Sequence, residues 1–151
     1  MTAGDILKEQ LLATTVCTVK TGEDIRKGEL VCDDGSGGGI LAATAALASD
    51  GLTVYMATEA SVAAVPAEIV CVEVGYVEVI KKTGNDIKKG TKVIVSATSG
   101  EADIYVAGDA QAAYDEAQVQ ALLDLIVNVI GRCAEDCLNA DTTMKILIGV
   151  I

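Results

Sequence analysis

Short apolar runs occur along most of this chain, separated by turns rich in Gly, Asp and Asn. Runs of this length that are rich in Val, Ile and Thr predict β-strands. The longest covers residues 68–81, and Gly75 within it predicts a bulge or a bend. Further strands are expected over residues 14–20, 29–32, 52–57, 91–98, 102–107, 126–133 and 144–151. The pattern therefore predicts a mainly β fold, with a small body of the β-barrel or β-sandwich type.

One segment has helical periodicity instead, and it predicts a single inserted helix over about residues 109–125. Asp109 is placed to cap its first turn. The apolar stripe of this helix consists of Val119, Leu122, Leu123, Ile126 and Val127. Such a stripe predicts either a subunit interface or ordinary packing against the core of the same chain. Residues 40–49 are ambiguous, because their alanines favour helix while their neighbours favour strand.

An eight-residue phrase occurs twice in the chain. Residues 21–28 read TGEDIRKG, and residues 83–90 read TGNDIKKG, 62 positions later. Each copy precedes a β-rich run, so the phrase is interpreted as a turn that begins a strand. Its two glycines predict a positive φ (Gly22 and Gly28, Gly84 and Gly90). Ile25 and Ile87 are the only large apolar residues of the phrase, which predicts that both are anchored in a core.

The first residues are expected to form an N-terminal arm over 1–13, followed by a single β-rich domain over 14–151. Four aliphatic residues of the arm have helical spacing, namely Ile6, Leu7, Leu11 and Leu12. A helix of this length is unstable alone, so the arm is expected to be mobile or a short helix.

Composition narrows the possible functions. The net charge of −11 argues against nucleic-acid binding, which needs a positive surface. Residues 40–48 are the longest apolar stretch and are far shorter than the ~20 residues of a spanning helix. No signal-peptide pattern is present in residues 1–20, so neither a membrane nor export is expected.

The residues that carry chemistry are sparse. The chain has no His, which excludes the Ser-His-Asp and Cys-His arrangements. Cys133 and Cys137 form a C-x3-C pair, but the remaining three cysteines are scattered singly, so no metal site is predicted. Glu135, Asp136 and Asp141 are interpreted as an acidic turn, and Glu78 as a residue at a sheet edge or subunit contact. Neither an enzyme nor a cofactor is expected.

Residues 14–151 as a whole resemble the capsid cement, or head decoration, proteins of tailed phages and related archaeal viruses. The features that carry the resemblance occur in a fixed order. They are the opening phrase at 15–31, the strand LTVYMATEAS at 52–61, the run VEVGYVEV at 72–79, IKKGTKVIVSATSGE at 87–101, and the closing VIGRCAEDC and TTMKILIGVI within 129–151. The helix over residues 109–124 departs from the family pattern as an insertion.

The resemblance implies a structural virion protein that is made in the host cytoplasm and is not an enzyme. It would bind the outer surface of a capsid built from HK97-fold major capsid protein, as a homotrimer, and stabilise contacts between capsomers. Multivalent contacts of this kind give an avidity that exceeds the affinity of any single site. The aliphatic residues of the arm would order on the shell, so deleting residues 1–12 should leave the fold intact and weaken capsid binding.

A second interpretation is left open. The phrase DIRKGELV is also similar to the start of SAF-type β-clip modules, which would make the chain a tandem ligand- or peptide-binding module of a cellular protein. Tandem modules should repeat their strands after each phrase. Residues 30–57 and 92–107 align poorly in sequence, so such a repeat is not expected here.

Overall fold

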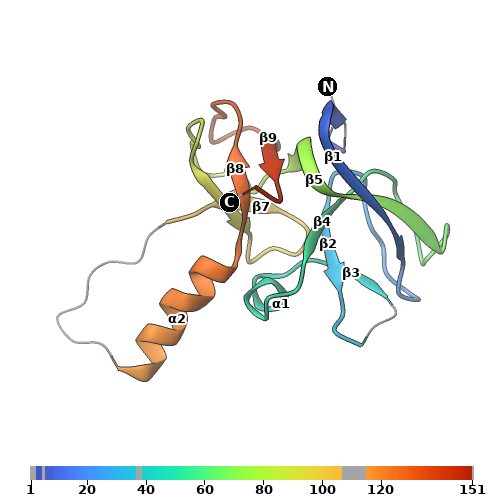
Figure 1. The fold of residues 1–151 in the computed structure, drawn as a ribbon, viewed down its shortest axis with the longest axis horizontal. Helices are drawn as coiled ribbons and strands as arrows, with labels where there is room; N and C mark the ends of the chain where they lie inside the picture. The colour runs from blue at the N-terminus through green and yellow to red at the C-terminus, as the bar shows by residue number, and fades with distance from the viewer. Residues whose placement is uncertain (1–2, 5, 37–38, 107–114, 151) are drawn as a thin grey trace.

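The computed structural model describes residues 3–4, 6–36, 39–106 and 115–150, and of these it describes residues 6–11 and 125 by their backbone alone. The described residues form nine strands and two helices (Figure 1). Their bounds are β1 (Ile6–Thr18), β2 (Leu30–Asp33), β3 (Ile40–Ala42), α1 (Ala45–Ser49), β4 (Val54–Ala57), β5 (Glu68–Ile80), β6 (Lys92–Val95), β7 (Ala102–Ile104), α2 (Glu116–Val127), β8 (Val129–Cys133) and β9 (Thr143–Ile148).

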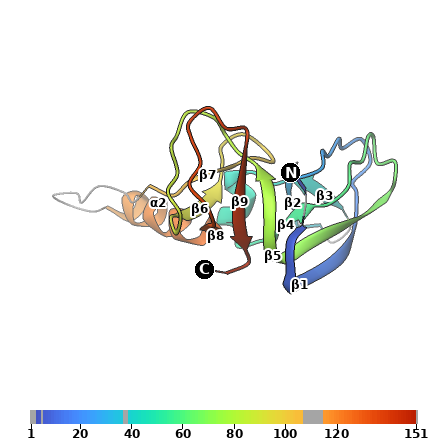
Figure 2. The ribbon, with the colours of Figure 1, turned by 90° about the horizontal axis from the view of Figure 1, so that it is seen from above.

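All the strands belong to one curled sheet, which confirms the mainly β fold with a helix. Their order is β3-β2-β4-β5-β9-β8-β6-β7, and β1 pairs with β5 outside this path. Seen from above, β5 runs through the middle of the body while α2 extends from one end (Figure 2). The long strand β5 therefore connects the two ends of the sheet.

The two ends of the sheet are built alike. In the first half, β2 pairs with β3, and Val31 lies opposite Ala42. In the second half, β6 pairs with β7 in the same way, and Val93 lies opposite Ile104. Val93 and Ile104 each follow their counterparts in the first half by 62 residues. β4 then pairs with β2 as β8 pairs with β6. β5 belongs to both halves, because it pairs with β4 at the end of the first and with β9 in the second. The chain is thus an internal repeat of one unit.

The expectation that the strands after each phrase are not repeated was wrong. Each unit places its helix after its third strand, α1 in the first and α2 in the second. Because the connection that holds α2 is much longer, the fourth strand of the second unit is β8, beyond the residues 92–107 that were compared. Insertion of a longer connection hides the repeat from a direct alignment.

The repeated phrase fixes both halves in the same way. Ile25 and Ile87 are fully buried, as predicted, and each exchanges two backbone hydrogen bonds with a loop, through Ser61 and Cys137 respectively. The glycines of the phrase have the predicted positive φ, +87° and +83° in the first copy (Gly22, Gly28) and +109° and +85° in the second (Gly84, Gly90). Each phrase therefore forms a turn that is hydrogen-bonded to the loop that follows the fourth strand of its half.

The first strand corrects the expected N-terminal arm. The structure shows neither a free segment nor a short helix over Ile6–Ala13, because β1 begins at Ile6 and pairs with β5. Its register is regular from Thr14 to Thr18 and shifts at three points between Ile6 and Thr14, opposite the stretch of β5 that contains Gly75. The first two shifts place extra residues on β1, and the third places one on β5 between Val72 and Val74, close to Gly75, where the bulge was predicted. Hydrogen bonding to an available sheet edge determines the conformation here, and the apolar spacing does not.

Other element boundaries also differ from the expected ones. Residues 40–49 contain both a strand and a helix, β3 and α1, joined by Thr44, whose hydroxyl caps α1. Asp109, the expected cap of the long helix, lies outside the described residues, and α2 begins after Asp115. The strand expected from Ile126 begins at Val129, because the helix continues to Val127.

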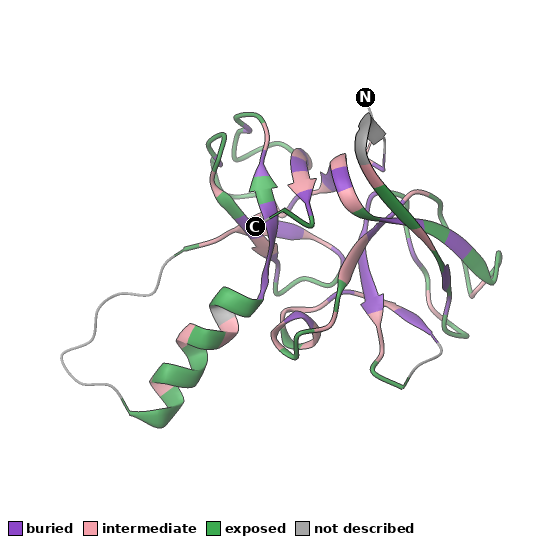
Figure 3. Cartoon of the chain, viewed as in Figure 1, coloured by how far each residue is buried: buried purple, intermediate pink, exposed green. Residues whose placement is uncertain are grey.

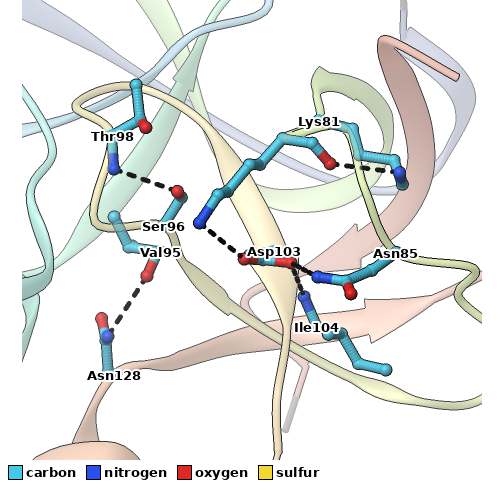
Figure 4. Close-up of polar contacts among 9 residues, drawn as sticks. Lys81, Asn85, Val95, Ser96, Thr98, Asp103, Ile104 and Asn128 are labelled. Carbon is cyan, nitrogen blue, oxygen red and sulfur yellow. Dashed lines mark hydrogen bonds and ion pairs between the residues drawn. The ribbon is translucent and has the colours of Figure 1, made fainter. Parts of the chain in front are cut away.

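The core consists of the inward faces of the strands, whereas most of α2 is exposed (Figure 3). The two halves differ at one buried position next to the repeated phrase. Val19 is buried in the first half, and its counterpart Lys81 is only 2% exposed. The Lys81 ammonium donates to the Lys82 carbonyl oxygen at 3.1 Å, which Figure 4 shows beside the polar cluster around Asp103. A buried ammonium with so few acceptors is unfavourable.

Replacing either phrase isoleucine should destabilise the whole chain. Ile25→Ala and Ile87→Ala each remove a fully buried side chain, so each is expected to lower the free energy of unfolding by roughly 2–5 kcal/mol. Urea unfolding followed by circular dichroism measures the loss. Val62→Ala, at a mostly exposed position, is the control. A loss no larger than that of the control would show that the phrase does not anchor the core.

Replacing the buried lysine should have the opposite effect. Lys81→Met keeps the length of the side chain and removes the buried charge, so the free energy of unfolding is expected to rise by on the order of 1 kcal/mol. The exposed Lys89→Met serves as the control for loss of a lysine. Destabilisation by Lys81→Met in the same urea assay would mean that the ammonium contributes more than its desolvation costs.

Candidate interaction surface

Helix α2 is the most distinctive surface feature of the described residues. Asp115 caps its first turn by accepting from the Gln118 amide at 2.9 Å, and the Gln118 side chain accepts from the Asp115 amide at 3.2 Å. This capping box is an Asp-x-x-Gln signal placed before an apolar run, and it identifies the start of the helix more accurately than Asp109 does.

The end of α2 is tied to the second half of the sheet. Asn128 follows the last turn, is buried, and donates from Nδ2 to the Val95 carbonyl of β6 at 3.3 Å (Figure 4). The backbone amide of Asn128 donates to the backbone carbonyl oxygen of Asp124 in the helix. The direction in which α2 leaves the body is therefore fixed at its C-terminal end.

The apolar stripe of α2 faces solvent within the chain. Val119, Leu123 and Ile126 are 44%, 50% and 58% exposed, and Leu122 is half-buried. Ordinary packing of the stripe against the core of the same chain is therefore contradicted. Val127 extends the exposed face at 49%. Aliphatic side chains gathered on one exposed helical face indicate a contact surface.

A groove continues this face at the base of the helix. It has a volume of about 310 Å³, and the side chains that give it an apolar character are Leu52, Val54, Val74, Val127, Val129 and Ile130. Sequence reasoning missed the groove, because its walls come from β4, β5, β8 and the end of α2. Only the pairing of these strands brings them together.

The charges of α2 are acidic. Glu116 lies in the first turn, and Asp124 accepts from Gln120 Nε2 at 2.7 Å beside the stripe. The last turn contains no basic residue. A surface that covers the stripe therefore meets an acidic flank.

The four aliphatic residues expected to contact a capsid through the arm lie in β1. Ile6, Leu7 and Leu11 lie in this strand, and the structure describes these three residues by their backbone alone. Leu12 is half-buried and packs against the main core. The structure thus places Leu12 against the core of the chain and not on the stripe of α2.

The acidic turn between β8 and β9 is held by hydrogen bonds. Glu135 accepts from Lys145 Nζ at 2.8 Å and from the Tyr76 hydroxyl at 3.0 Å. Asp136 accepts from the Lys89 amide at 2.8 Å and from Lys88 Nζ at 3.2 Å. The Lys145 ammonium is the main cause that lowers the pKa of Glu135, and the Lys89 amide is the main cause for Asp136.

Glu78 occupies an unexpected position near this turn. It lies in the interior of the sheet between β1 and β9, rather than at an edge. It is only 6% exposed, pairs with Lys145 across the strands, and accepts from the Thr143 hydroxyl at 2.7 Å.

The cysteines are buried free thiols. Desolvation raises the pKa of Cys32 and of Cys133 to about 11, which keeps both protonated near neutral pH. In the described part of the chain, no three His, Cys, Asp or Glu side chains are grouped so that they could hold a metal ion. Neither described helix has the length and apolar character that crossing a membrane requires.

Compared with known proteins, the chain matches no family model and no curated sequence. The resemblance to capsid cement proteins therefore stays a prediction from sequence, and the repeated fold and the exposed face of α2 are the structural facts on which a function is argued.

The acidic turn should make stability depend on pH. A carboxyl whose pKa is lowered by folding contributes stability above its unfolded pKa, which is lost as the pH falls through the folded value. For Glu135 the unfolded value is 4.5, so its contribution should decrease below that pH. Urea unfolding of Glu135→Gln and wild type at about pH 6 and about pH 3 compares the two conditions. The difference between the proteins should shrink at the lower pH, and a constant difference would contradict the role of Glu135.

Proposed function

We propose that this chain is a structural protein without catalytic activity, which binds the outer surface of an HK97-fold capsid as a homotrimer and stabilises contacts between capsomers. The observation that carries the proposal is the apolar face of α2, which lies outside the core of its own chain. The order of motifs over residues 14–151, similar to capsid cement proteins, supports the shell as the partner.

Within this proposal, α2 forms the subunit interface. Val119, Leu122, Leu123 and Ile126 are spaced so that helices from several copies can pack along one seam. A helix of 12 residues is short for stable association alone. Several copies that also touch a shell gain from multivalency, because each further contact is intramolecular.

The role of the N-terminal residues changes under this proposal. Because Ile6–Thr18 already pair with β5, the shell contact is not assigned to a free arm. Deleting residues 1–12 would remove part of β1 and the packing of Leu12, so it would affect the fold as well as binding.

One observation favours a second candidate function. The two halves repeat the same strands, as expected for tandem SAF-like β-clip modules that bind a ligand or a peptide. In a module of that kind the function would lie in the repeated body. In a capsid protein of the proposed kind it would lie in the subunit interface and in a shell-facing surface.

The interface on α2 is tested by a change of oligomeric state. Leu123→Asp places a charge on the exposed face, so the wild-type trimer is expected to dissociate into monomers. Ala121→Asp places the same charge on the opposite, exposed side of α2 and should leave the trimer intact. Sedimentation equilibrium measures the mass of each. A wild type that is monomeric at all concentrations would refute the interface.

Capsid binding is tested on the virion itself. Mass spectrometry of purified heads should find this chain among the shell proteins at high copy number, and added protein should bind to heads that lack it. Absence from heads, together with capture of a small molecule or peptide by the purified chain, would support the β-clip function instead.

A further inference from the structure

A polar pocket lies beside the acidic turn of the second half, formed by β5, β9 and the turn between β8 and β9. Its volume is about 380 Å³. Four carboxylates and one ammonium line it, together with a threonine hydroxyl, and these are Glu78, Glu135, Asp136, Asp141, Lys145 and Thr143. We call it the acidic pocket. The excess of carboxylates gives its walls a negative charge.

Three of the carboxylates hold the turn in shape. Glu135 and Asp136 accept hydrogen bonds from lysines as described, and Asp141 accepts from the Leu138 amide at 2.7 Å. These contacts explain why the carboxylates are present, and on their own they do not indicate a ligand.

Glu78 is different, because its carboxylate is buried and only half satisfied. One oxygen, Oε1, accepts from the Thr143 hydroxyl at 2.7 Å. The other, Oε2, is buried and has no hydrogen-bond partner among the described residues. A buried carboxylate oxygen without a donor is costly, and native proteins rarely retain one without a reason.

The repeat shows that the fold itself does not require this carboxylate. The pairing of Glu78 with Lys145 corresponds to the pairing of Val16 with Val70 in the first half. Val16 is 63% exposed, and the same strands form around it without any charge. Glu78 is therefore an addition to the second half, where it faces Lys145 across the strands and still keeps one oxygen without a donor.

We propose that the acidic pocket binds an ammonium or guanidinium group, supplied either by a small organic cation or by a Lys or Arg side chain of a protein partner. Such a group donates N–H hydrogen bonds, which the unpaired oxygen of Glu78 lacks. Glu78 lines the pocket, so a group bound there lies next to this carboxylate. A metal ion fits less well, because the described carboxylates are not grouped as metal ligands.

The test uses the full chain and free probes, so it does not depend on capsid binding. N-acetyl-arginine amide and N-acetyl-lysine amide are titrated into ¹⁵N-labelled protein, with tetramethylammonium as a cation that has no N–H donor. Saturable amide shifts are expected at residues 78 and 143–145 with the first two probes and not with the third. Equal shifts with tetramethylammonium, or none with any probe, would overturn the proposal.

Two variants separate the pocket from the general acidity of the chain. Glu78→Gln removes the charge and keeps an acceptor for Thr143, and it should weaken binding of the arginine probe by roughly tenfold or more. Glu68→Gln makes the same change at an exposed position of β5 and should bind as the wild type does. Equal affinity of the two variants would refute the role of Glu78. Should Glu78→Gln fail to fold, Glu78→Val, which copies the first half, takes its place.

The source of the cation follows from a second measurement with the same variants. If Glu78→Gln loses occupancy on purified heads while Glu68→Gln keeps it, the group comes from a basic side chain of the shell. If both decorate heads normally and the free probes still bind, the pocket takes a small organic cation.

Discussion

The shared strand β5 is the constraint on which the rest of the structure depends. Its 13 residues pair with β1 on one side and with β4 and then β9 on the other. Each half therefore needs β5 to complete its own sheet, and neither half closes its core without it. Both repeated phrases adjoin the same strand, because the loop that holds Ile25 leads directly into β5 and the second phrase follows the end of β5.

Local patterns in the sequence predicted the parts of the fold that are decided locally. Ile25 and Ile87 are predicted as anchors because they are the only large apolar residues of the phrase, and its glycines follow from turn chemistry. Strand β5 follows from its β-branched residues. The conformation of β1 could not be predicted in this way. Ile6, Leu7 and Leu11 fit a helical spacing, but pairing with the distant strand β5, in which Val77 is the partner of Ile6, makes the segment a strand.

The candidate site was predicted in part for the same reason. Helical periodicity identified the stripe of Val119, Leu123 and Ile126, but whether it packs inward or faces solvent depends on where Asn128 fixes the helix against β6. The groove and the acidic pocket were not predicted, since each is assembled from strands distant in sequence. The burial of Glu78 in particular is visible only once β5 lies between β1 and β9.

The repeat also separates what the scaffold needs from what one half has acquired. The connection between the third and fourth strands is short in the first half, where it holds α1, and long in the second, where it holds α2. Both versions leave the second and third strands paired in corresponding register, and the fourth strand still pairs with the second, although β8 has a register shift against β6 that β4 does not have against β2. The α1 connection around Asp50 and Gly51 is consequently a natural insertion point for displaying a foreign peptide, because its counterpart already carries an extra segment without loss of the sheet.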